Sequence, residues 1–203
     1  NVPKINMDAS LKNRYLAEAK FIRALSFFRL VRAFGDVPLR LTVAADASEY
    51  NIGKNPKADV YAQIEKDLTE AAAILPPSYT SADLGRATKG AALGLHAKVA
   101  MYQKKWADVL NYTNQVMTLG YSLLPVYDNV FRIAAENGPE SVFEIQASIL
   151  LGNPDASNSQ YSQVQGVRGI TGGGWGFNVP TAELAAAFET GDPRRDATII
   201  FRG

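Results

Sequence analysis

The segment AEAKFIRALSFFRLVRAFGDVPL, which spans Ala17–Leu39, has the composition of a helix but carries apolar side chains on every side. Wound at about 100° per residue, Phe21, Leu25 and Phe28 form one stripe, and further alanine, valine and phenylalanine residues cover much of the remaining surface. Because no wide polar face is left for water, the helix is expected to be buried on more than one side. Stacked helix pairs bury each inner helix in this way, so the segment predicts a mainly α protein built from such pairs.

Three arginines interrupt this apolar surface, at Arg23, Arg29 and Arg32. A buried guanidinium needs a carboxylate partner, whereas a long side chain near a helix edge can extend its charged end into solvent. We therefore expect each of the three either to pair with a carboxylate or to reach water.

Capping residues and prolines mark the ends of four predicted helices. Gly35 supplies the left-handed conformation that ends the first helix, Pro76 ends the second, and Thr88 is an N-cap for the third. The predicted helices span about residues 10–34, 59–75, 89–103 and 106–119. Two lysines separate the last two, which is typical of a helical hairpin, and Trp106 is expected in the helical core. The hairpin has the length of one tetratricopeptide unit, so residues 1–125 are predicted to form tetratricopeptide-like helical pairs.

The chain changes character after Gly120. Apolar and polar residues alternate in ESVFEIQAS, residues 140–148, which predicts a half-buried strand, and TIIF at 198–201 is strand-like as well. Between them, residues 148–180 contain seven glycines and no helical period, and Thr181 is an N-cap for a short helix. Residues 126–203 are therefore expected to form a loop-rich, ligand-binding type of segment with a minor β component, packed on the helices.

Composition argues against several classes of protein. The 21 basic and 20 acidic side chains give a net charge of +1, which leaves no surplus for gripping a phosphate backbone, so no nucleic-acid partner is expected. The absence of cysteine removes disulfides, thiol catalysis and thiolate metal sites. No apolar run has the length needed to cross a bilayer. Because the chain starts at Asn1 and ends on a strand-like run, we expect it to be an internal fragment of a longer protein.

Residues suited to catalysis, cofactors or metal ions are scarce. His96 is the only histidine and lies among apolar residues of the third predicted helix, where a packed imidazole is more common than a catalytic base. The glycines of GVRGITGGGWG do not open a helix at the spacing that binds pyrophosphate. The oxygen-bearing residues of NPDASNSQ lack the central glycine and final glutamate of a calcium-binding loop. The sequence thus predicts no enzyme, no cofactor and no metal site.

The glycine-rich loop is the most suggestive stretch for ligand binding. It combines aromatic side chains with amide and guanidinium groups, at Trp175, Tyr161, Asn158, Gln163 and Arg168. A sugar ring packs its C–H face on an aromatic ring, while its hydroxyls need oriented donors and acceptors. These five residues are the predicted ligand-binding set, with Trp175 as the stacking platform. The alternative is that Trp175 anchors the loop to the helices.

Five stretches, in their order along the chain, resemble proteins of the SusD/RagB family. They are RYLAEAKFIRALSFFRLVRAFGDVPL, DVYAQIEKDLTEAAAILP, RATKGAALGLHAKVAMYQKKWADVLNYTNQVM, ESVFEIQAS and WGFNVPTAELAAAFETGDPRRDATI. Together they cover most of the chain. The Glu-Ala-Lys-Phe-Ile-Arg-Ala run with the later Gly-Asp-Val-Pro, and the Asp-Pro-Arg-Arg near the other end, make the combination specific.

The resemblance implies a cell-surface lipoprotein of Bacteroidetes that takes part in polysaccharide utilization. Such a protein is built on tetratricopeptide helical pairs, binds a glycan or other nutrient without catalysis, and delivers it to a SusC-like TonB-dependent outer-membrane transporter. The resemblance also implies a membrane attachment through a lipid anchor outside this chain. The alternative function is a tetratricopeptide scaffold that binds a protein partner. The two functions differ in where the ligand contacts fall, which is the loops after Ser148 for the first and the helical groove for the second.

Overall fold

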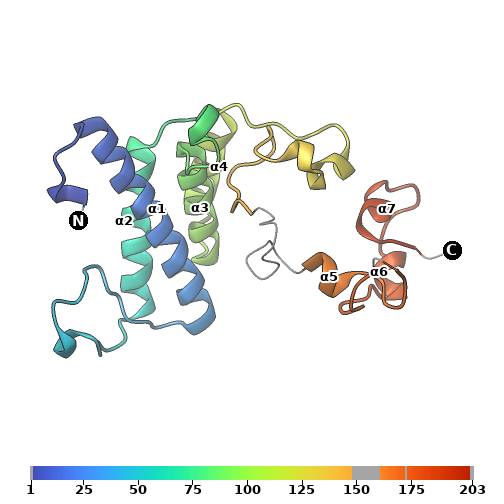
Figure 1. The fold of residues 1–203 in the computed structure, drawn as a ribbon, viewed down its shortest axis with the longest axis horizontal. Helices are drawn as coiled ribbons and strands as arrows, with labels where there is room; N and C mark the ends of the chain where they lie inside the picture. The colour runs from blue at the N-terminus through green and yellow to red at the C-terminus, as the bar shows by residue number, and fades with distance from the viewer. Residues whose placement is uncertain (1, 148–160, 172, 202–203) are drawn as a thin grey trace. The chain divides into compact units, whose positions relative to one another are not determined.

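The computed structural model describes residues 2–147, 161–171 and 173–201, which form two compact units. The first unit runs to Ser122 and includes Pro139–Glu144, and the second comprises Leu123–Gly138 and the residues from Ile145 onward. In Figure 1 the first unit contains the four long helices coloured blue to green, whereas the second contains short helices and turns. The described chain is mainly α, which confirms the predicted fold class.

Four helices build the first unit: α1 (Ala9–Phe34), α2 (Lys57–Ile74), α3 (Lys89–Tyr102) and α4 (Trp106–Met117). Three single 3₁₀ turns accompany them: η1 (Val2–Lys4), η2 (Ala47–Glu49) and η3 (Ser81–Asp83). Successive helices pack on one another, α1 on α2, α2 on α3 and α3 on α4, as Figure 1 shows. This is the predicted arrangement of tetratricopeptide-like pairs. No helix in the described part of the chain has both the length and the apolar composition needed to cross a bilayer.

The helix ends follow the predicted signals. Gly35, at φ +70°, ends α1, and Thr88 Oγ1 accepts a backbone hydrogen bond of 3.0 Å at the start of α3. The second helix begins at Lys57 rather than at the predicted Asp59, because it is capped from outside: Asp36 Oδ1 accepts a hydrogen bond of 2.8 Å from Lys57 N. The aspartate of the Gly-Asp-Val-Pro stretch therefore joins the end of α1 to the start of α2.

The core of the first unit lies between α1, α2 and α3. The largest apolar side chains that expose less than 2% of their surface are Phe21, Val60, Ile64, Leu68 and Val99. Phe28 exposes 2%, and its ring contacts that of Tyr102 edge-on, with the centroids 5.3 Å apart. Of the predicted stripe, Phe21 and Phe28 are thus confirmed as core, and Leu25 is partly buried and packs against it.

The arginines of α1 behave as expected. Arg23 forms a bidentate pair with Asp67 of α2, with Nε–Oδ2 and Nη2–Oδ1 distances of 2.7 and 2.6 Å. Asp67 exposes 1% of its side chain and accepts a further hydrogen bond of 2.9 Å from Gln63 Nε2. Arg29 and Arg32 are exposed and reach water.

Two expectations about burial are wrong. The first helix was expected to be buried on more than one side, but its outer side is open: Ile22 is exposed and Phe34 exposes 74% of its surface. The reason is that the helical neighbour of α1 in this unit is chiefly α2. Trp106 exposes 63% of its surface and is not in the helical core. The reason is that α4 meets the core with its other side, through the partly buried Tyr112 and Val116.

The predicted strand at residues 140–148 is also wrong for its described part. Strand pairing among the described residues is limited to an isolated bridge between Val37 and Asn55. Pro139–Glu144 instead lies against the helices of the first unit, where Phe143 packs edge-on to Phe21 with ring centroids 4.8 Å apart. The alternating pattern identified a half-buried side chain, but the surface that covers it is helical.

The second unit is built from short elements: η4 (Tyr127–Phe131), η5 (Ile133–Ala135), α5 (Tyr161–Gln165), α6 (Ala182–Ala186) and α7 (Arg194–Thr198). The predicted cap at Thr181 is present, since its Oγ1 accepts a hydrogen bond of 3.3 Å from Leu184 N. The predicted strand at TIIF is wrong, because Thr198 belongs to α7 and the next residue, Ile199, is buried outside any strand.

Candidate functional site

The predicted ligand-binding residues fall in a compact loop, which we call the aromatic loop and define as residues 161–178 without 172. It begins with α5, coloured orange in Figure 1. Five backbone hydrogen bonds tie residues 173–177 to α5 and the following turn, among them Trp175 N to Gln163 O at 2.8 Å and Phe177 N to Val164 O at 2.9 Å. The backbone that carries the two aromatic residues is therefore fixed by residues that precede it in sequence.

Trp175 and Phe177 present their rings together at the surface. The ring planes are 87° apart with centroids separated by 6.5 Å, and the two residues expose 46% and 54% of their surface. Arg168 lies beside both, because its Nε donates a hydrogen bond of 2.7 Å to Trp175 O and its guanidinium lies 5.7 Å from the Phe177 centroid. Gly176 has φ +69°, and a Cβ there would lie 3.0 Å from Arg168 Cβ. Glycine thus permits the close approach of the arginine.

The structure brings together three of the five predicted site residues. Trp175, Gln163 and Arg168 lie within the hydrogen-bonded part of the aromatic loop. Gln163 contributes its backbone oxygen there, and its side chain is exposed. Tyr161 is the exposed first residue of α5, and Asn158 lies outside the described residues.

Phe177 is missing from the predicted set, although its ring is the nearest aromatic neighbour that the structure gives Trp175. The alternation rule for extended strands could not have found this pair, because Gly176, which separates the two rings, has φ +69° and is not extended.

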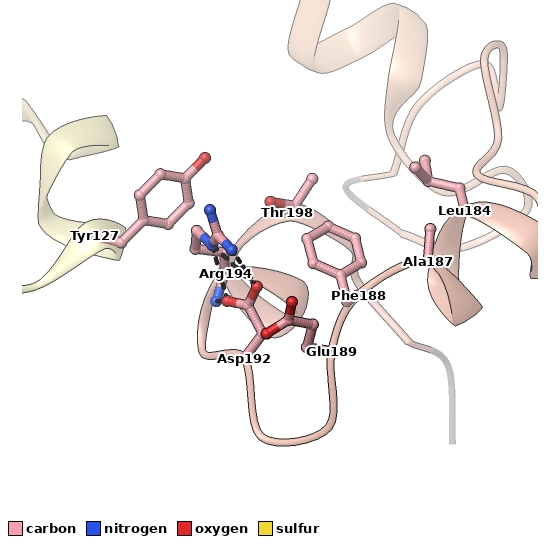
Figure 2. Close-up of a pocket in the computed structure, with 8 residues that line it drawn as sticks. All are labelled: Tyr127, Leu184, Ala187, Phe188, Glu189, Asp192, Arg194 and Thr198. Atoms are coloured by element: carbon pink, nitrogen blue, oxygen red, sulfur yellow. Dashed lines mark hydrogen bonds and ion pairs between the residues drawn. The ribbon is translucent and has the colours of Figure 1, made fainter.

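A cavity in the second unit, drawn in Figure 2, was also not predicted. It has a volume of about 480 Å³ and is lined by Tyr127, Leu184, Ala187, Phe188, Glu189, Asp192, Arg194 and Thr198. Figure 2 shows Arg194 and the rings of Tyr127 and Phe188 around the same space. Rings and charged groups in one hollow are a second arrangement that can hold a polar ligand.

Two of the charged residues of this cavity, Asp192 and Arg194, form an ion pair with each other. The Asp192 carboxylate accepts hydrogen bonds from the backbone N, the Nε and the Nη2 of Arg194, at 2.5 to 3.0 Å. The arginine side chain is the main cause that holds the pKa of Asp192 below its ordinary value, and the same bonds raise the pKa of Arg194. The Asp-Pro-Arg-Arg stretch therefore closes the turn that begins α7, which is a structural role.

The first unit has an apolar hollow of its own along the helices. It has a volume of about 560 Å³ and is lined mainly by α1, α3, α4 and the segment that follows Pro139. Val142 and Phe143 form part of its wall, since Val142 Cγ1 lies 3.3 Å from where a Cβ on Gly94 would be and Phe143 packs on Phe21.

His96 is a packed core residue, as expected. It is buried in the first unit and stacks on Tyr112, with ring centroids 4.0 Å apart and planes 19° apart. Burial lowers the pKa of His96, and this effect is larger than the increase in pKa caused by the negative charges of Glu65 and Asp108. In the described part of the chain, no group of three or more histidine, aspartate or glutamate residues is placed to hold a metal ion.

Acidification is expected to destabilise the protein through His96. Because the folded state lowers the imidazole pKa below its ordinary 6.5, the stabilisation is complete above pH 6.5 and is lost as the pH falls through the lowered value. Urea unfolding at about pH 7.5 and about pH 5 measures this change. His96→Leu is expected to reduce the difference between the two conditions. An unchanged difference in the variant would assign the acid sensitivity to other groups.

Comparison with known proteins places these features in context. Residues 2–101 match a SusD-like family model described as starch-binding and associating with the outer membrane. The chain is 30% identical to SusD-like protein P2 of Formosa agariphila over 207 residues, which cover 98% of this chain and 41% of that protein.

Solved structures of SusD-like proteins are also similar to this chain. A laminarin-binding SusD-like protein superposes with a TM-score of 0.87 at 32% identity, over 97% of this chain and 48% of that one. A SusD-like protein of Bacteroides fragilis superposes with a TM-score of 0.77 at 32% identity, over 91% and 37% of the two chains. The chain thus spans less than half the length of each of these relatives.

Proposed function

The chain belongs to the SusD-like family, and from this membership we propose that it contributes the ligand-contacting loop of a glycan-binding protein. A similar protein that binds laminarin supports glycan as the ligand class. The observation that carries the proposal is the pair of half-exposed rings, Trp175 and Phe177, with Arg168 beside them and Gln163 joined to Trp175 through its backbone oxygen. Such rings accept the C–H face of a sugar, and the polar groups suit its hydroxyls.

In this proposal the protein binds its glycan and does not cleave it. Hydrolysis of a glycosidic bond generally uses a pair of carboxyl groups, one on each side of the bond. Residues 161–178 contain no aspartate or glutamate, and the only histidine, His96, is buried against Tyr112. The groups offered to a ligand by the aromatic loop orient it without transferring protons at neutral pH.

The proposed location is the outer surface of the outer membrane, reached through a lipid anchor, and the proposed partner is a SusC-like TonB-dependent transporter. The description of the matching family model supports the location, and the family resemblance supports the partner. Purifying the tagged full-length protein from detergent-extracted outer membranes is expected to bring the transporter with it. Recovery of the intact protein without any such transporter would contradict the partnership.

Replacing Trp175 with alanine in the full-length protein is expected to weaken glycan binding by about 5- to 150-fold, because one sugar face packed on an indole contributes about 1–3 kcal/mol. A screen against neutral and charged glycans identifies a binding glycan, and calorimetry then gives its affinity for each variant. The circular dichroism spectrum should stay unchanged, since Trp175 lies outside the helical core.

Tyr127→Ala is the matched control, because it removes an aromatic ring from the other hollow of the second unit. It should leave the affinity close to that of the unmodified protein. If Tyr127→Ala weakens binding and Trp175→Ala does not, the glycan occupies the cavity of Figure 2. If neither matters and a peptide binds instead, the alternative function as a protein-binding scaffold gains support.

A further inference from the structure

The aromatic loop carries a single positive charge that has no carboxylate partner in the described part of the chain, and we propose that this charge selects anionic glycans, whose sugars bear a carboxylate or a sulfate ester. The inference rests on the proposed glycan-binding function and names the substrate class of the same site. It depends on Arg168, on the absence of a carboxylate partner for it in the described chain, and on its place beside the two rings.

Arg168 is the only charged side chain of the aromatic loop, since residues 161–178 contain no lysine, aspartate or glutamate. In the described part of the chain it contacts Trp175 O and the Phe177 ring, and no carboxylate. The other arginines described in the second unit all have carboxylate partners: Arg132 pairs with Asp128, Arg194 with Asp192 and Arg195 with Asp196. Arg168 thus departs from the pattern of its own unit.

Among the described residues, the terminal nitrogens of this guanidinium have no hydrogen-bond partner. Its Nε is used by Trp175 O at 2.7 Å, and the ring of Phe177 lies 5.7 Å from its centre, so the side chain is held in place. The two terminal nitrogens are left, and they form the planar fork that binds carboxylate or sulfate oxygens in pairs.

The fork also lies where a sugar substituent would be. The Phe177 ring is 6.5 Å from the Trp175 ring and 5.7 Å from the guanidinium, so a sugar that packs on the rings has its substituents within reach of Arg168. A hydroxyl there would accept a single hydrogen bond from the charged donor. A carboxylate or sulfate would add the attraction between opposite charges and can accept two parallel bonds from the fork.

Binding of the full-length protein to matched glycans tests the inference. The panel holds laminarin and dextran as neutral glycans, alginate and polygalacturonate as uronates, and dextran sulfate as a sulfate ester. Dextran against dextran sulfate, and alginate against carboxyl-reduced alginate, compare one backbone with and without its charge. The charged member of a pair is expected to bind about tenfold more tightly at low salt, with the difference shrinking as salt screens the charge. Preference for the uronate or for the sulfate arm identifies which oxyanion is selected.

Two variants of Arg168 separate its charge from its contact with Trp175. Arg168→Gln removes the charge and should abolish the preference for the charged glycan, whereas Arg168→Lys keeps the charge and should retain part of it. Arg195→Gln is the matched control, because Arg195 also lies over a phenylalanine ring, that of Phe201 at 5.1 Å, but is already paired with Asp196. It should leave the preference unchanged.

The outcomes distinguish this inference from the function on which it rests. Equal binding of charged and neutral partners, or a charge preference that survives Arg168→Gln, overturns the inference and leaves glycan binding in place. Tight binding of laminarin or dextran without binding of the charged glycans also overturns the inference and leaves glycan binding in place. Failure of every glycan in a wide screen to bind the folded protein overturns the proposed function and the inference with it.

Discussion

Replacing Phe28 with alanine is expected to lower the free energy of unfolding by about 3–5 kcal/mol. The ring exposes 2% of its surface, contacts Tyr102 edge-on at 5.3 Å, and has the guanidinium of Arg32 4.9 Å from its centroid. Truncation removes these contacts and leaves a cavity between α1 and its neighbours that rigid helices fill only in part. Chemical denaturation of the protein followed by circular dichroism measures the loss.

Phe34→Ala provides the matched comparison on the same helix. Phe34 exposes 74% of its surface, so its removal should change stability by no more than about 0.5 kcal/mol. If Phe28→Ala costs less than about 1 kcal/mol, the packing of α1 on α2 and α3 is wrong.

Breaking the ion pair between α1 and α2 is expected to have the second large effect. Arg23→Ala leaves the carboxylate of Asp67, which exposes 1% of its surface, with Gln63 as its remaining side-chain donor. An unpaired buried charge costs about 3–5 kcal/mol. The Arg23 side chain is 32% exposed, so water can enter when it is truncated, and we expect about 3 kcal/mol, the lower end of that range. Denaturant unfolding at neutral pH measures it.

Lys20→Ala tests whether burial is the cause. Lys20 joins the same two helices through Glu70 at 2.5 Å, but both side chains are more than one-third exposed, so its loss should cost less than about 1 kcal/mol. The double variant Arg23→Leu with Asp67→Leu should recover most of the stability, because it leaves no unpaired charge. Equal losses for Lys20→Ala and Arg23→Ala would show that the buried pair has no special role.

The candidate site was predictable in its composition and not in its geometry. Trp175, Gln163 and Arg168 were recognisable as residue types that suit a sugar. Their arrangement depends on backbone hydrogen bonds between α5 and the segment after the glycines, such as Trp175 N to Gln163 O, which no local pattern encodes. The cavity of Figure 2 is a similar case, because it joins Tyr127 to residues far along the chain.

By itself, the sequence determined the parts of this protein that depend on neighbouring residues. The end of α1 at Gly35 and the caps at Thr88 and Thr181 follow from interactions within a few positions, so local chemistry is sufficient to predict them. The order of the helices and the family motifs could also be predicted from the sequence, because amphipathic spacing and turn residues are local features as well.

Only the tertiary structure decided which apolar face meets which neighbour. Trp106 was expected in the core and is exposed, whereas Phe143 was expected in a strand and packs on a helix. The capping aspartate of α2, Asp36, and the carboxylate partner of Arg23, Asp67, also come from distant positions. Burial and ion pairing are properties of surfaces brought together by the whole chain, and the free energy that selects among possible pairings is the sum over those surfaces, which no single segment contains.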